Sequence, residues 1–255
     1  FKCDWSSDVC SSDLLLAEAE QPPRSAKFKA GEHFKINIYY NWGFIWLNAG
    51  WAQFNIYDTT WQGKPALHLL STGSTHSGYD WFFKVRDRYE AVVRPDSYLP
   101  YWFHCNTNEG SFWTRENVTF NYDDSIAILH TESAKRPFGI DTIKIDPTIT
   151  DLVSAIYVCR SMDLSNLTEN QQIPIPVIVG NKLYNLHIRY IGKETIVTRQ
   201  EHVYNCRKFA VMMVNGTIFS GGEDLTAWVS DDDRNVPILL EAKITVGSVK
   251  GYLEE

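Results

Sequence analysis

The feature that most constrains this chain is a repeated alternation of apolar and polar residues, first clear over residues 32–40. There Phe34, Ile36 and Ile38 alternate with His33, Lys35 and Asn37. Because a period of two puts successive side chains on opposite faces of a strand, one face can be buried and the other hydrated. The same alternation returns along most of the chain from about residue 27, so the sequence predicts a mainly β protein.

The alternating segments are separated by turn signals. We expect strands within residues 31–57 (two strands), 65–73, 87–94, 98–107, 111–122, 125–133, 138–145, 173–179, 182–191, 193–200, 202–214, 224–230, 236–246 and 248–253. Gly180-Asn181 and residues 191–193 are predicted hairpin turns. Gly50, inside a strand, predicts a bulge or a close backbone approach. Twist accumulates over so many strands, so we predict a large antiparallel sheet curled into a partial or closed barrel.

Two segments depart from the alternation. Residues 77–85 are predicted to form a short helix or turn that plugs an open end of the sheet. After turn and cap residues at 146–150, apolar residues recur at helical spacing through about residue 161. We therefore expect one or two short helices, with the apolar face of the second covering one opening or face of the sheet.

The first residues need separate treatment. Residues 4–14 resemble a translated sequencing adaptor, and residues 14–19 resemble the end of a signal peptide with a cleavage site after Ala19. We therefore predict that residues 1–26 are scar, signal-peptide remnant and disordered leader, and that residues 27–255 form a single β-barrel-like domain. The expected location is outside the cytoplasm, in the periplasm or at the outer-membrane periphery.

Composition excludes some partners. The net charge is −7, the pI is about 5.5 and there is no basic stripe, so we expect no nucleic acid. The apolar runs are too short to span a membrane, although a membrane tether stays open, and we expect a monomer. Three cysteines remain outside the scar, namely Cys105, Cys159 and Cys206. They form no disulfide framework or metal motif, so burial is expected and one bridge stays open.

The motifs for catalysis are missing. There is no G-x-S-x-G elbow, and the seven histidines are scattered without metal-ligand spacing. Residues 231–235 alternate like part of a calcium loop, but Val236 and Ala242 stand where that loop needs glycine and glutamate. We therefore predict a solvated turn there, no cofactor, and no enzyme, although a site assembled from distant strands stays open.

Aromatic residues are the better lead to function. Eight of the nine tryptophans lie outside the scar, and aromatic walls suit both lipid tails and sugar rings. The candidate ligand-binding residues are Trp42, Trp46, Trp81, Phe83 and Trp228. The alternative is that a large barrel packs its core with these side chains.

A family resemblance rests on several separated motifs. These are Gly31-Glu32, residues 42–45 with Ala49-Gly50, residues 80–87, residues 151–157 with Arg160, and residues 228–232 with Pro237. In their order and spacing the chain resembles domain of unknown function 3108, a family of exported bacterial proteins common in Bacteroidetes. The resemblance implies a β-barrel-like envelope protein without a known activity.

Three functional hypotheses follow. The first is a non-enzymatic envelope protein that binds an apolar or amphiphilic, lipid-like ligand in an aromatic-lined barrel cavity. The second is a glycan-binding or polysaccharide-associated surface module, which requires tryptophans on outward or rim positions with polar neighbours. The third is a hydrolase with a non-local site, which requires a cleft holding a histidine or paired carboxylates with shifted pKa values.

Overall fold

The computed structural model describes residues 21–24, 28–42, 45–81, 83–214, 222–243 and 248–254, with only the backbone for Trp42 and Ile45. These residues form one sheet of 14 strands and one α-helix. The elements are β1 (His33–Trp42), β2 (Ile45–Trp61), β3 (Lys64–Thr75), the 3-10 turn η1 (Ser77–Tyr79), β4 (Arg86–Val93), β5 (Pro100–Glu109), β6 (Phe112–Asn121), β7 (Ile126–Ser133), β8 (Arg136–Lys144), α2 (Leu152–Ser161), β9 (Gln172–Val179), β10 (Lys182–Val197), β11 (Val203–Met213), β12 (Gly222–Ser230), β13 (Pro237–Lys243) and β14 (Ser248–Leu253).

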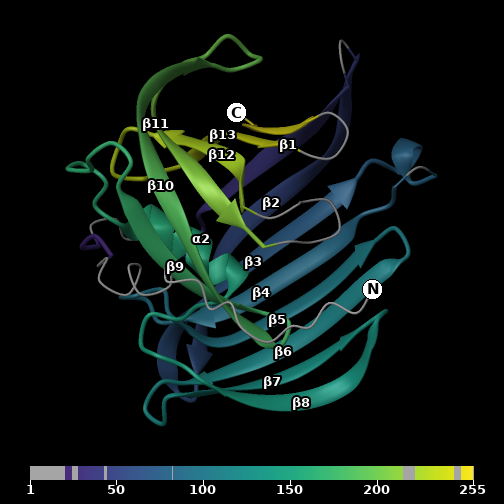
Figure 1. The fold of residues 1–255 in the computed structure, drawn as a ribbon, viewed down its shortest axis with the longest axis vertical. Coiled ribbons are helices and arrows are strands. Elements are labelled where there is room, and N and C mark those ends of the chain that lie inside the picture. Colours follow the sequence, from purple (N-terminus) through teal and green to yellow (C-terminus); the bar gives the residue numbers. More distant parts are fainter. Residues whose placement is uncertain are drawn as a thin grey trace, which may run out of the picture.

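The sheet is antiparallel and open. Its strand order is β8-β7-β6-β5-β4-β3-β2-β1-β14-β13-β12-β11-β10-β9, so the first and last strands of the sequence pair in the middle. Within the described residues, β8 and β9 each pair with one strand, and a short parallel bridge from Thr150 covers part of the other edge of β9. The sheet curls so that β9 and β10 lie opposite strands from the first half of the sequence (Figure 1). The predicted partial barrel is confirmed.

The helix α2 lies inside this curl. The carboxylate of Asp151 caps it by accepting hydrogen bonds from the backbone N–H groups of Val153 and Ser154, at 2.8 and 2.9 Å. The predicted helix is confirmed, but its cap is Asp151 and not a residue of 146–150. The helix contacts β9, β4 and β3, and buries Val153 and Tyr157 in the main core. It therefore fills part of the hollow instead of closing it from outside.

The inner face of the sheet changes character along its strands. Phe103 in β5, Val118 in β6 and Leu129 in β7 are buried in the same core as residues of α2 and β9, and the pairing register puts them side by side. Two residues further toward the other end, the same register aligns Cys105, Glu116 and Thr131, and then Thr107, Thr114 and Ser133. We call the apolar part the covered half and the polar part the open half.

Two local predictions need correction. Residues 191–193 form no hairpin, because β10 runs unbroken from Lys182 to Val197 and absorbs the extra residue as a bulge between Tyr190 and Gly192. The turn η1 exists, but it buries no residue and Trp81 beside it is 83% exposed, so the described residues of this segment do not plug the hollow. The prediction for Gly50 is confirmed, since a Cβ there would collide with the carbonyl oxygen of Ser74 and a register shift follows Ile38.

The acidic turn between β12 and β13 is exposed to solvent at Asp233 and Arg234, as predicted, but it is also anchored. Asn235 is 2% exposed and donates hydrogen bonds to the carbonyls of Arg160 and Met162, at 2.8 and 3.1 Å. Asp231 pairs with Arg207 and Lys193. This turn therefore ties β12 and β13 to the end of α2.

The segment before β1 and the cysteines complete the core. Arg24 donates hydrogen bonds to the Ser161 hydroxyl and the Val158 carbonyl, at 2.8 and 3.3 Å, so this part of the predicted leader lies against α2. All three described cysteines are free thiols, with Cys105 and Cys206 buried. Burial raises the pKa of each thiol, in the case of Cys159 to about 12.

Candidate functional site

The open half forms the floor of a cleft. The cleft has a volume of about 870 Å³ and lies between β6 and β7 on one side and the hairpin joining β9 to β10 on the other. Its lining comes from Ser111, Phe112, Thr114, Glu116, Thr131, Glu132, Ser133, Ala134, Lys135, Arg136, Val179, Gly180, Asn181, Lys182, Tyr184 and Val214. The hairpin can reach β6 because the curl of the sheet brings strands from opposite ends of the sheet together.

Glu116 is the most unusual residue of the floor. It is only 6% exposed, and its Oε1 accepts a hydrogen bond from the backbone N–H of Gly180 at 3.0 Å. Burial raises the pKa of Glu116, and the bond from Gly180 opposes that shift only in part. The sheet therefore holds in the cleft a buried carboxyl group whose pKa lies above its ordinary value.

Thr131 lies beside Glu116 in the register of β6 and β7. It is 4% exposed, and its hydroxyl oxygen has no hydrogen-bond partner among the described residues. A buried hydroxyl without a partner is costly, and such groups call for an explanation in a native structure. Thr131 also belongs to the lining of the cleft.

The sides of the cleft combine charge with apolar surface. Lys135 and Lys182 are exposed at its rim, whereas Arg136 pairs with Asp141 at 2.8 Å. Apolar surface comes from Phe112, Val179, Tyr184 and Val214. The cleft can therefore accept a molecule with both a polar and an apolar part.

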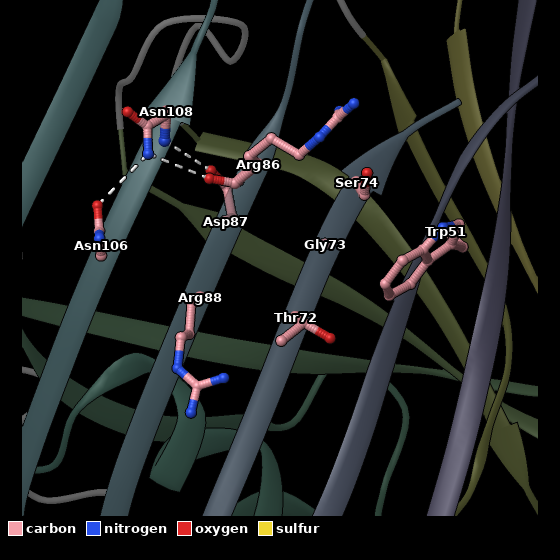
Figure 2. A pocket seen from close by; sticks show the side chains of 9 residues that line it. All are labelled: Trp51, Thr72, Gly73, Ser74, Arg86, Asp87, Arg88, Asn106 and Asn108. Carbon is pink, nitrogen blue, oxygen red and sulfur yellow. Dashed lines mark hydrogen bonds between the residues drawn. The ribbon is translucent and has the colours of Figure 1, made fainter. Parts of the chain in front are cut away.

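A second, shallower hollow lies on the outer face of β2 to β5. It has a volume of about 390 Å³ and is lined by Trp51, Thr72, Gly73, Ser74, Arg86, Asp87, Arg88, Asn106 and Asn108. Figure 2 shows the indole of Trp51 on one side, with the arginines of β4 and the asparagines of β5 on the other. Burial raises the pKa of Asp87 to about 6, although the backbone N–H of Asn108 opposes this by donating to its carboxylate.

None of the candidate residues whose side chains are described lines either hollow. Trp46 is 40% exposed beside Arg199 and Lys250, and Trp81 is 83% exposed. Phe83 lies over Gly110. Trp228 is 6% exposed and donates a hydrogen bond to Glu194 at 3.1 Å in a second, smaller core. The side chain of Trp42 lies outside the described residues.

The described residues contain no group of three or more His, Cys, Asp or Glu side chains able to hold a metal ion. Nor do they contain a helix long and apolar enough to cross a membrane.

The residues of the cleft were missed because each strand was treated as having one buried, apolar face. The signal was present in the strand phase. In β6, Phe120 and Val118 share their parity with Glu116 and Thr114, so a glutamate stands at an inward position. Polar residues at inward positions of neighbouring strands predict a polar part of the interior.

A curled, open antiparallel sheet with a helix in one half of its hollow and a polar cleft in the other defines a β-barrel-like protein. The chain belongs to the family described as protein of unknown function (DUF3108), whose model matches residues 34–254. The family resemblance expected from the sequence is thereby confirmed.

The other comparisons give information on the fold alone. No curated protein matches the chain. Among solved structures, the chain is similar to a β-barrel-like protein of domain of unknown function DUF1849 from Brucella abortus, with a TM-score of 0.54 and 6% identity. The match covers 93% of this chain and 98% of that one. At so low an identity, the likeness extends to architecture and not to activity.

Proposed function

We propose that the protein is a non-enzymatic, exported envelope protein that binds an amphiphilic molecule in the cleft of the open half. The observation that carries the proposal is the pair of buried polar groups on the floor, the Glu116 carboxyl and the unpartnered Thr131 hydroxyl. A hydroxyl-bearing head group would hydrogen-bond to these groups. The apolar part of the ligand would lie along Phe112, Val179 and Tyr184.

The covered half argues against a purely apolar ligand deep in the barrel. Leu129 is fully buried there, and α2 supplies Val153 and Tyr157 to the same cluster. Side chains already fill that space, so the cleft of the open half is the larger of the two described hollows left for a ligand. This moves the expected site away from the tryptophans and toward β6, β7 and the β9–β10 hairpin.

Native mass spectrometry tests the binding. Protein made by periplasmic expression is mixed with n-dodecyl-β-D-maltoside, which has a sugar head, or with dodecanoate, both below their micellar concentrations. We expect one-to-one complexes with the maltoside and weaker ones with dodecanoate, because a hydroxylated head offers more hydrogen bonds to the floor. Solvent extraction of untreated protein would show a co-purifying amphiphile.

A matched pair of variants locates the site. Thr114→Trp fills the cleft from the inner face of β6, whereas Thr119→Trp adds the same bulk on the exposed outer face of that strand. We expect Thr114→Trp to abolish complex formation and Thr119→Trp to leave it unchanged. Equal complex formation by both variants, or no complex with either amphiphile, would refute the proposal.

Export forms a separate part of the proposal. It is supported by the apolar run and the cleavage-site pattern at residues 14–19. Fractionation of the native host, with cytoplasmic and periplasmic marker enzymes, checks it. Recovery of the protein with the cytoplasmic marker would contradict export without touching the binding proposal.

A further inference from the structure

The outer face of β2 to β6 carries an aligned row of polar and aromatic side chains. The register pairs Trp51 of β2 with Ser74 of β3, and Ser74 with Arg86 of β4. On the next strand, Asn108 of β5 donates a hydrogen bond to the Arg86 carbonyl at 3.4 Å and pairs with Trp113 of β6. Neighbouring strands are about 4.8 Å apart, so the row spans about 19 Å from one tryptophan to the other.

The hollow of Figure 2 lies within this row and the parallel row beside it. That second row runs through Thr72, Arg88 and Asn106, again aligned by strand pairing. Hydroxyl, amide and guanidinium groups therefore line the same hollow as the flat indole of Trp51. An aromatic face that contacts C–H groups, surrounded by donors and acceptors for hydroxyls, is suited to a sugar ring.

The charges of this surface are already paired. Arg86 contacts Asp80 at 2.7 Å, and Arg88 contacts Glu90 at 2.8 Å. Arg115, whose guanidinium lies 5.1 Å from the ring centre of Trp113, contacts Glu132 at 3.2 Å. Since each arginine has a carboxylate partner, the surface offers hydrogen bonds without a net positive field and suits a neutral ligand.

We infer that the outer face of β2 to β6 is a binding site for a neutral oligosaccharide chain, with Trp51 as the stacking platform. The oligosaccharide lies across the strands, because the row of side chains crosses them and ends in a second tryptophan. Thr72, Asn106 and Arg88 supply hydrogen bonds to its hydroxyl groups. This site is on the opposite face of the sheet from the cleft and does not depend on the proposed function.

Affinity electrophoresis tests the site with the whole protein. Native gels containing a soluble β-glucan, α-mannan, xylan or galactan are compared with gels containing polygalacturonate and with plain gels. We expect at least one neutral polymer to retard the protein, and the retardation to persist in 0.5 M NaCl because charge contributes little. Retardation only by polygalacturonate, lost in salt, would overturn the inference, as would no retardation by any neutral polymer.

Variants of the platform complete the test. Trp51→Ala should weaken the affinity read from the retardation at least about fivefold, since stacking on an aromatic ring contributes on the order of 1–3 kcal/mol. Trp51→Tyr should retain most of it, which separates the loss of stacking from a folding defect. The control Trp81→Ala removes a tryptophan that is 83% exposed and lies outside the row. A Trp51→Ala protein that is retarded like the wild type would refute the assignment.

Discussion

The covered and open halves of the inner face are built from the same strands, yet the covered half is a packed core and the open half lines a cleft. In β7, Leu129 is completely buried in the core that α2 and β9 help to form, whereas Thr131, two positions on, lines the cleft and its hydroxyl has no partner among the described residues. Both side chains point inward, and both are nearly inaccessible to solvent. The difference between them is that Leu129 belongs to the main core with α2 and β9, whereas Thr131 belongs to the lining of the cleft.

The comparison shows how an open sheet can be stable and still offer a site. Burial of apolar surface provides most of the favourable free energy of folding, and here it is concentrated in the half that α2 fills. The other half is therefore free to hold polar groups that add little to stability. Mutations in the two halves should separate stability from binding.

The largest effect is expected in the covered half. Leu129→Ala would leave a cavity among Phe103, Val118 and the residues of α2. We expect it to lower the free energy of unfolding by about 2–5 kcal/mol, the range of such truncations in packed cores. Urea denaturation followed by circular dichroism measures this. A loss below about 1 kcal/mol would mean that the covered half is not a packed core.

The strands and the helix could be predicted from the sequence, because alternation and helical spacing are local. The cleft could not, because Glu116 meets Gly180 only after the sheet has curled. The path of β10 could not be predicted either. A glycine between two strand-like segments suggests a turn, but Gly192 follows a bulge within one continuous strand. The inward polar residues in β5, β6 and β7 indicated a polar part of the interior. They were overlooked because the inward face was assumed to be apolar along its whole length.

The cap of α2 should give the next largest effect, through pH. Burial raises the pKa of Asp151 to about 6 from its ordinary 3.8, against the opposing hydrogen bonds from Ser154 and Val153. The folded state then binds this proton more tightly than the unfolded chain. The unfolding free energy contributed by Asp151 therefore falls as pH rises from about 4 through about 6, by at most about 3 kcal/mol.

Asp151→Asn isolates this contribution, since asparagine can still cap the helix but does not titrate. The difference in unfolding free energy, wild type minus variant, should fall between pH 4 and pH 7 in urea titrations. Asp163 supplies the opposite sign, because hydrogen bonds from the hydroxyl and backbone N–H of Ser165 lower its pKa. For Asp163→Asn the same difference should rise with pH. Parallel stability curves for wild type and Asp151→Asn would show that the cap carboxylate does not titrate in this range.

The smallest effect on stability should come from the open half, although that is where binding is lost. Thr131→Val keeps the shape of the side chain and removes a buried hydroxyl that has no partner in the described structure. We expect the unfolding free energy to change by less than about 1 kcal/mol, or to rise slightly, because no hydrogen bond is broken in the free protein. Binding of n-dodecyl-β-D-maltoside should weaken about fivefold, since the ligand loses one hydrogen bond on the floor of the cleft. A stability loss as large as that of Leu129→Ala would instead mean that Thr131 holds the fold, and that the two halves of the inner face do not divide stability from binding.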